Sequence, residues 1–229
     1  MQETTLFKSK QLPWFYEVTR ILTSSSFNFL YNLDFRNMDR IAGLKEEGFL
    51  VLPKHQFMMD IPLEGLYLYN AIGKRAHYIM KHSLPFYLEY LGGIKVFRKL
   101  DIRKDALPEE RLKLIERVAY EKQRLDAIMA YLVNRGEKVV IHPEAERRYR
   151  KSFTPRVDLL ERLVKMKTEK DPIFVPMAIT YSNGKHFKSR ITVDAGVPLQ
   201  TRCHKELESH LREYIPDEIS LGGPGILKA

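Results

Sequence analysis

The sequence predicts an α/β fold, in which a layered domain with a mixed central sheet flanked by helices is preceded by an N-terminal helix pair. Between residues 48 and 214, short apolar runs alternate with segments of helical periodicity, a pattern typical of α/β layers. Polar side chains follow the ends of several predicted strands, which is where sites lie in such folds. With 229 residues, of which 44% are hydrophobic, the chain can form the core of one such domain.

Residues 12–35 form the predicted N-terminal pair. They are rich in aromatic and aliphatic side chains and include the only tryptophan of the sequence, Trp14. Four apolar side chains recur at helical spacing, namely Phe15, Val18, Ile21 and Leu22. Because residues 24–26 are all serine, we expect two short helices joined there. The pair either packs against the core or is an amphipathic anchor in the surface of a membrane.

The rest of the chain is predicted element by element. Strands are expected at residues 48–53, 76–80, 94–97, 138–141, 173–181 and 190–197. Helices are expected at residues 61–72, 84–91, 108–134, 155–167 and 202–214. The longest helix is bounded by Pro108 in its first turn and Gly136 just beyond its end.

We expect three segments along the chain. Residues 1–36 form the amphipathic helical segment, residues 37–220 the folded domain, and residues 221–229 a loose tail. The N-terminus shows no secretory signal, and no run approaches the roughly 18 apolar residues of a membrane span. The expected location is therefore the cytoplasm.

Charge and cysteine content narrow the class of protein. The formal net charge of +9 indicates an anionic partner and leaves open nucleic acid, a membrane surface or a phosphorylated small molecule. The single cysteine, Cys203, excludes an internal disulfide and a zinc site built from several cysteines.

His55 and Asp60 follow the first predicted strand. An aspartate that binds one imidazole nitrogen orients the ring, so that the other nitrogen can accept a proton from a hydroxyl. The spacing permits this contact only if the chain turns between the two residues. Alternatively, Asp60 is simply the N-cap of the helix that follows.

A second polar group follows the strand at residues 138–141. His142 and Glu144 suggest metal ligation, but no third ligand stands at a recognisable spacing, so we expect no metal there. Glu144 is more plausibly an acceptor for a substrate hydroxyl or a partner of Arg147. Guanidinium groups near these strand ends, those of Arg98 and Arg147 among them, could hold a phosphate. The sequence contains no glycine-rich phosphate loop and no Gly-x-Ser-x-Gly elbow.

Four blocks in this order resemble those of the glycerophospholipid acyltransferase family, typified by 1-acyl-glycerol-3-phosphate acyltransferases. The family's Asn-His-x-x-x-x-Asp corresponds to residues 54–60, and its Gly-x-Ile-Phe-Ile-x-Arg to residues 92–98. Its Phe-Pro-Glu-Gly-Thr-Arg corresponds to residues 142–147, and its Val-Pro-Val-Ala-Ile to residues 175–179. The resemblance covers a little over half of the chain.

The resemblance implies an O-acyltransferase of phospholipid biosynthesis. His55 would be the general base that deprotonates the acceptor hydroxyl, and Asp60 would orient it. The hydroxyl would then attack an acyl thioester directly, without an acyl-enzyme. The donor would be acyl-CoA or acyl-carrier-protein, the acceptor a lysophospholipid or a glycerol-phosphate-like molecule, and no cofactor would be needed.

The same resemblance implies roles for the other blocks. Arg98, Glu144 and Arg147 would hold the acceptor, with the arginines on its phosphate, and Val175 and Pro176 would line the acyl side. The N-terminal segment would anchor the protein peripherally on the cytoplasmic face of a membrane, so the anionic partner would be membrane lipid and not nucleic acid.

The blocks also depart from the family pattern. Lys54 replaces asparagine, His142 replaces phenylalanine, and Ala145 and Glu146 replace glycine and threonine. The extra carboxylate of Glu146 repels a phosphate unless an arginine neutralises it. The acceptor therefore stays open among lysophosphatidic acid, another lysolipid, a neutral alcohol and a different headgroup.

Two other readings also stay open. The chain could be a non-catalytic basic module that binds anionic membrane or nucleic acid, although no nucleic-acid motif is recognisable. It could also be an inactive family member, because its third block is altered. Acyl length, donor carrier and oligomeric state are not determined by the sequence.

Overall fold

The computed structural model describes residues 7, 9–54, 56–102, 107–144, 153–182 and 188–215, without the side chain of Leu100. His55 and Arg147, which the sequence singles out, and the predicted tail at residues 221–229 therefore lie outside the described residues.

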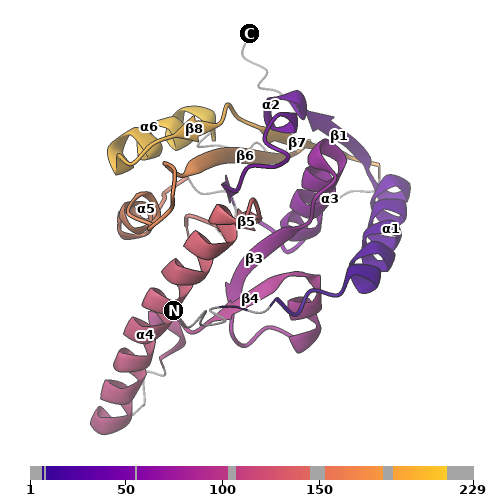
Figure 1. The fold of residues 1–229 in the computed structure, drawn as a ribbon. Helices are drawn as coiled ribbons and strands as arrows, with labels where there is room; N and C mark the ends of the chain where they lie inside the picture. The colour runs from indigo at the N-terminus through magenta and orange to yellow at the C-terminus, as the bar shows by residue number, and fades with distance from the viewer. Residues whose placement is uncertain are drawn as a thin grey trace.

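The centre of the molecule is a mixed sheet, which has eight strands in the described part of the chain (Figure 1). The strands are β1 (Asn32–Arg36), β2 (Phe49–Pro53), β3 (Ala76–Lys81), β4 (Gly93–Val96), β5 (Lys138–Val140), β6 (Ile173–Tyr181), β7 (Arg190–Ala195) and β8 (Leu199–Gln200). Their order is β1-β7-β6-β2-β5-β3-β4, and β8 pairs with β6. Strands β2 to β6 all run in one direction, whereas β7, β1 and β8 run in the other.

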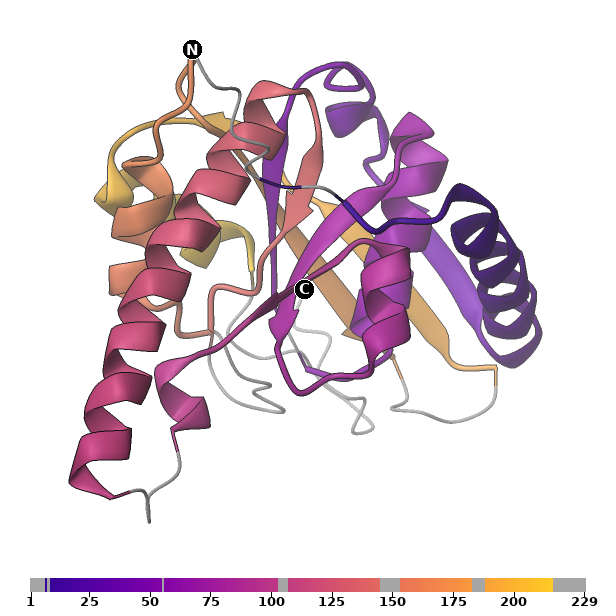
Figure 2. The same cartoon turned by 60° about the horizontal axis from the view of Figure 1, so that its bottom comes forward.

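Helices flank this sheet (Figures 1 and 2). The α-helices are α1 (Pro13–Leu30), α2 (Asp39–Ala42), α3 (Asp60–Ile72), α4 (Pro108–Asn134), α5 (Val157–Val164) and α6 (His204–Tyr214). Two 3₁₀ helices, η1 (Phe86–Leu91) and η2 (Lys99–Asp101), follow β3 and β4. The α/β fold with a central sheet between helices is therefore confirmed.

The core has two parts because neighbouring residues of β2 point to opposite faces of the sheet. Leu50 and Leu52 pack in one cluster with buried residues of α4, α5 and α6. Phe49 and Val51 pack in the other cluster with buried residues of α2 and α3. Both faces of β2 are fully covered, as expected for a strand in the parallel part of a sheet.

The N-terminal helix pair is wrong in detail. Residues 13–30 form one continuous helix that runs through the serines, because serine costs only a few tenths of a kcal/mol in a helix and Phe27, just beyond them, packs against the core. Residues 32–36 are not helical either. They form β1, which pairs in parallel with β7 and partly buries Leu33 and Phe35 at alternate positions.

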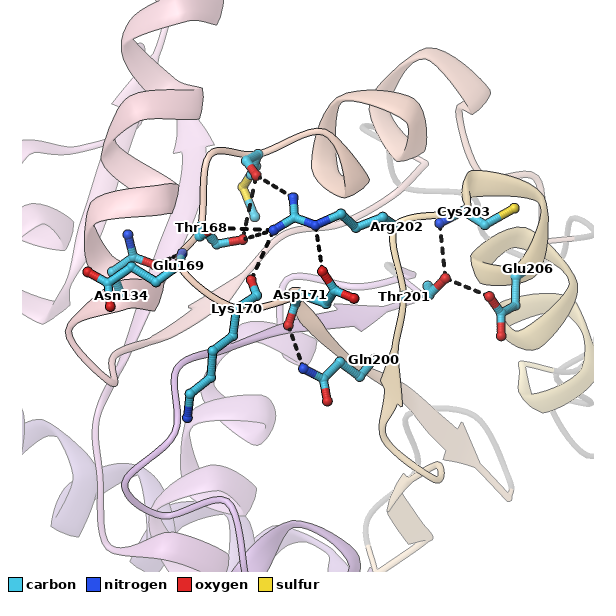
Figure 3. A network of polar contacts seen from close by, with 11 residues as sticks. Asn134, Thr168, Glu169, Lys170, Asp171, Gln200, Thr201, Arg202, Cys203 and Glu206 are labelled. Atoms are coloured by element: carbon cyan, nitrogen blue, oxygen red, sulfur yellow. Dashed lines mark hydrogen bonds and ion pairs between the residues drawn. The ribbon is translucent and has the colours of Figure 1, made fainter.

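The amino edge of the sheet, where β5 and β6 begin, is closed by a network around Arg202 (Figure 3). The guanidinium of Arg202 donates hydrogen bonds to the carbonyls of Met166, Thr168 and Lys170, at 3.0–3.2 Å. It also donates to a carboxylate oxygen of Asp171 at 2.6 Å. This single side chain ties the connection between α5 and β6 to the start of α6.

No helix in the described part of the chain is both long enough and apolar enough to cross a bilayer.

Candidate functional site

Strands β2 to β6 end at one edge of the sheet, which we call the carboxyl edge. Two buried polar side chains follow β2 there, Lys54 and Gln56, and Asp60 begins α3. His142 and Glu144 follow β5. A run of polar residues at one sheet edge is expected for an α/β site, and it brings together side chains that are far apart in the sequence.

Asp60 is fully buried and its carboxylate is held from two sides. One oxygen, Oδ2, accepts hydrogen bonds from the backbone N–H groups of Gln56 and Phe57, at 2.6 and 2.7 Å. The other, Oδ1, accepts one from the hydroxyl of Tyr181 at the end of β6, at 2.5 Å. These bonds fold the chain between Gln56 and Asp60 into a turn that leads into α3.

The N-cap alternative for Asp60 is wrong. The helix begins at Asp60 itself, and its carboxylate accepts bonds from residues that precede the helix, whereas an N-cap accepts them from residues that follow. Burial, followed by the charge of the Asp60 carboxylate, raises the pKa of Tyr181 far above its usual value. The phenol therefore stays protonated and donates to the aspartate.

Glu64 lies one turn after Asp60 on α3 and is also fully buried. Its Oε1 lies 3.1 Å from Nε2 of His142. Burial by itself would lower the pKa of His142, but the carboxylate of Glu64 and the charges of Asp60 and Glu144 outweigh burial, and the pKa is raised. The site thus contains a histidine–carboxylate pair that sequence spacing did not indicate.

Arg98, the arginine of the second block, lies after β4 and is organised by Asp101. The carboxylate of Asp101 accepts bonds from the backbone N–H of Arg98 and from its guanidinium, at 2.9–3.3 Å. Lys81 is the last residue of β3, and His82 follows it. Nζ of Lys81 and Nδ1 of His82 each lie 3.4 Å from an oxygen of the same carboxylate. Burial would raise the pKa of Asp101, but the hydrogen bonds from Arg98 and Lys81 outweigh it, and the pKa is lowered.

Glu144 is buried, and its Oε1 accepts a hydrogen bond from the backbone N–H of Thr154 at 3.0 Å. The carbonyl of Pro143 accepts another from the N–H of Arg156 at 2.9 Å. The third block thus connects, through Glu144, to the segment that leads into α5.

An apolar cavity of about 360 Å³ lies beside this polar group. Its walls come from α1, α3, β3 and η1, and they are mostly apolar, with Pro62, Leu66, Ile79 and Leu88 among the lining side chains. Gly93 also lines it, and a Cβ there would lie 1.4 Å from the end of Met80 and 2.8 Å from the carbonyl oxygen of Leu88. The cavity depends on a glycine at this position.

A second cavity of about 400 Å³ lies between β3, β4, α4 and α5. It is rich in cationic side chains, namely Lys81, Arg98, Lys99, Lys122, Arg156 and Arg162. Glu121 and Asp158 contribute carboxylates to the same lining. This basic cavity has the charge that an anionic group requires.

The apolar and basic cavities share part of their lining. Ile61, Ile79, Met80 and Leu84 belong to both, and so does His142. Ile61 directly follows Asp60 in α3. The two cavities therefore meet next to the buried carboxylates, with His142 as the polar side chain in their common wall.

An apolar surface lies on the solvent-exposed side of α1. We call it the α1 stripe; it consists of Trp14, Val18, Ile21, Leu22 and Phe29, each at least 49% exposed. Tyr16, Thr19, Arg20 and Thr23, on the other side of the same helix, line the cavity. Figure 1 shows α1 at the outer side of the molecule, beside α3.

The structure brings together some of the residues that the sequence predicts. Asp60, Arg98 and Glu144 all lie at the carboxyl edge. Val175 and Pro176 lie in the buried interior of β6 and are not among the residues that line either cavity. Within the described ranges, no three His, Cys, Asp or Glu side chains are grouped to hold a metal ion.

Sequence reasoning missed three members of this site. Glu64 follows Asp60 by four residues, so helical spacing could have indicated that both lie on one face of α3. Asp101 follows Arg98 by three residues in a polar stretch. Tyr181 carries no such local signal, because 121 residues separate it from Asp60.

Comparison with known proteins identifies the fold. No protein-family model and no curated protein sequence matches the chain. Among solved structures, the chain is similar to the crystal structure of the 1-acyl-sn-glycerophosphate (LPA) acyltransferase, PlsC, from Thermotoga maritima, with a TM-score of 0.55. The two are 17% identical in sequence, and the match covers 87% of this chain and 76% of the other. The chain thus has a fold similar to that of an acyltransferase.

Proposed function

We propose that this protein is an O-acyltransferase that moves a fatty acyl chain from an acyl thioester to a hydroxyl of a lysophospholipid or a glycerol-phosphate-like acceptor. The donor is acyl-CoA or acyl-carrier-protein. The observation that carries the proposal is the pair of cavities, one apolar and one basic, that meet beside Asp60. An acyl chain and a phosphate-bearing group need these two environments, and the reacting bond forms where they meet.

In this proposal His55 is the general base and Asp60 orients it. Each oxygen of a carboxylate can accept more than one hydrogen bond, so the bonds from Gln56, Phe57 and Tyr181 are compatible with a further bond from an imidazole N–H. The acceptor hydroxyl loses its proton to His55 as its oxygen attacks the thioester carbon. The C–S bond then breaks, and the thiolate takes the proton from His55.

Arg98 and Arg147 bind the acceptor phosphate in the proposal, together with Glu144. The basic cavity supports the assignment of Arg98, because Arg98 is one of its lining cations. Asp101 aligns the guanidinium of Arg98 by charge-assisted bonds, which are stronger than neutral ones. Val175 and Pro176 pair with β2 and line neither cavity, so the proposal gives them no direct contact with the acyl chain.

We further propose that the protein acts while bound peripherally to the cytoplasmic face of a membrane. The α1 stripe supports this, because exposed apolar side chains on one helix face are typical of helices that lie in the headgroup region. The apolar cavity begins on the opposite side of the same helix, so a lipid chain would have a short path from the bilayer into the cavity.

A donor and acceptor panel tests the activity. Long-chain acyl-CoA and acyl-carrier-protein are offered with glycerol-3-phosphate, several lysophospholipids and neutral alcohols, and the lipid product is measured by mass spectrometry. Free thiol is measured in parallel, with a blank for the exposed Cys203. We expect thiol release only with an acceptor present.

Variants then test the base. We expect His55→Ala to lower turnover by about 10²–10⁴-fold, the usual contribution of a general base. The matched control is His204→Ala at the start of α6, which lines neither cavity. Equal turnover of His55→Ala and wild type would refute the assignment of the base.

Two results would favour the other readings. Binding to anionic vesicles or nucleic acid without transfer to any acceptor would favour a non-catalytic module. Activity that appears only after Ala145→Gly and Glu146→Thr would favour an inactive family member.

Vesicle sedimentation tests the membrane contact. The double variant Ile21→Gln, Leu22→Gln removes two exposed apolar side chains from the α1 stripe. Burial of such a side chain contributes about 1.5–3 kcal/mol, so we expect at least a tenfold loss of vesicle affinity. The control is Val197→Gln, an exposed apolar residue between β7 and β8; an equal loss in the control would argue against a contact through α1.

A further inference from the structure

His142 lies where the apolar cavity and the basic cavity meet. It lines the apolar cavity and the basic cavity, and the other residues described in both linings are aliphatic or methionine. His142 has lost most of its contact with solvent, since only 12% of its side chain is exposed. A polar side chain at this position faces both cavities and little bulk water.

Glu64 is the ion-pair partner of this histidine. Glu64 is fully buried, and its second oxygen, Oε2, has no hydrogen-bond partner among the described residues. A buried carboxylate is costly unless a positive group compensates it, and the imidazole 3.1 Å away is that group. The pair therefore favours a protonated His142.

Charged groups on the neighbouring elements act on His142 in both directions. Asp60 and Glu64 act on His142 from α3, and Glu144 acts from its own loop; all three favour the protonated ring. Cations of the basic cavity, such as Lys81 and Arg98, face the same space and act in the opposite direction. The result is a pKa of His142 above its usual value.

We propose that His142, held in place by Glu64, supplies a positive charge that stabilises the oxygen of the thioester carbonyl during acyl transfer. The inference rests on the proposed function. A histidine at this position is particular to this chain, because the acyltransferase block that residues 142–147 resemble begins with phenylalanine. A preorganised positive group in a water-poor site is an effective way to stabilise such an oxygen.

The acceptor oxygen forms a bond to the carbonyl carbon, and the electron pair of the C=O bond moves onto the carbonyl oxygen, beside His142. When that pair returns, the C–S bond breaks and the thiolate leaves. His142 keeps its proton throughout, and the proton of the hydroxyl travels through His55 to the thiolate. Glu64 acts only through His142 and is a positioning residue.

Two variants test this assignment. His142→Phe installs the residue of the resembled block, and Glu64→Gln keeps the shape of the side chain without its charge. We expect kcat to fall at least 30-fold in His142→Phe, with KM for donor and acceptor within about threefold of wild type. His204→Phe serves as the matched control, and thermal unfolding of each variant checks the fold.

The pH profile separates a charge from a merely structural role. Activity should decline as pH rises through the pKa of His142, and Glu64→Gln should move this decline to lower pH. Titration of the His142 ring by NMR, in wild type and in Glu64→Gln, measures the same shift without turnover. The two shifts should agree in direction and size.

Three outcomes would overturn the inference. In the first, His142→Phe retains kcat within threefold of wild type, which leaves the proposed function intact. In the second, the His142 titration moves in Glu64→Gln while the activity profile does not. In the third, wild type transfers no acyl chain with any donor and acceptor, which would overturn the proposed function as well.

Discussion

Polar side chains gather at both edges of the sheet, but they have different partners. At the amino edge, the cations Lys138 and Arg202 donate to backbone carbonyls: Lys138 to those of Lys45 and Gly136, at 2.6 and 2.5 Å, and Arg202 to three others (Figure 3). At the carboxyl edge, the carboxylates of Asp60, Glu64 and Asp101 have the side chains of Tyr181, His142 and Arg98 as partners, besides backbone N–H groups.

The difference indicates which edge is built for stability and which for chemistry. The carbonyls at the amino edge are fixed parts of the chain, and neither Lys138 nor Arg202 lines the apolar or the basic cavity. The carboxyl edge contains ionisable pairs beside two cavities, and an oxygen of Glu64 has no partner among the described residues. Perturbed titratable groups in a cleft are typical of functional sites.

The largest expected difference between the two edges is in turnover, when an aspartate at each edge is replaced by asparagine. Asp60→Asn should lower acyl transfer by about 100-fold or more, because an amide cannot stabilise a protonated base as a carboxylate does. Its NH₂ group would also face donors at Gln56, Phe57 or Tyr181. Asp171→Asn, at the amino edge, is the matched control and should leave steady-state turnover unchanged. If the turnover of Asp60→Asn stays within threefold of wild type, the assignment of the chemistry to the carboxyl edge is wrong.

The next effect is on stability at the amino edge. Arg202→Ala removes the hydrogen bonds that tie α5, β6 and α6 together, and we expect the free energy of unfolding to fall by about 2 kcal/mol. That corresponds to a melting temperature lower by about 4–8 °C for a chain of this size. Turnover per folded molecule should not change. Arg190→Ala, on an exposed position of β7, is the control for urea unfolding. If Arg202→Ala loses turnover but keeps its stability, the amino edge serves the chemistry and the contrast between the two edges is wrong.

Gly93→Ala tests whether the acyl chain occupies the apolar cavity, which Gly93 lines. The added methyl would force Met80 and the carbonyl of Leu88 to move, and both residues line the apolar cavity. We expect activity with long acyl chains to fall about tenfold relative to short ones, since one methylene is worth about 1–3 kcal/mol in such a pocket. Gly43→Ala is the control, because its Cβ would have nothing within 4 Å. An unchanged chain-length profile would mean that the acyl chain lies elsewhere.

The smallest effect is a dependence of stability on pH at Asp101. Its folded pKa is lowered, so its contribution is present above the unfolded pKa of about 3.9 and is lost as pH falls through the folded pKa. Asp101→Asn should unfold more easily than wild type at neutral pH, by about 1 kcal/mol. The two urea curves should converge below pH 4; parallel curves down to pH 3 would contradict the ion pair with Arg98.

Several elements could be predicted from the sequence because their signals are local. The helix at 108–134 and the strand at 173–181 have the predicted bounds, since proline and glycine delimit the first and a long apolar run defines the second. Residues 12–35 predict two helices because the serines at 24–26 interrupt the pattern locally, whereas residues 13–30 form one helix. Packing of Phe27 against the core outweighs that weak propensity.

The sequence by itself determined the α/β class, the order of most elements and the edge at which the polar residues lie, because periodicity and strand-end position are local properties. Only the tertiary structure decided how these side chains pair. Tyr181 reaches Asp60 across 121 residues and His142 reaches Glu64 across 78. The two cavities likewise arise from helices and strands far apart in the chain. Such contacts depend on strand order and helix placement, which are set by the packing of both core clusters together and by no single segment.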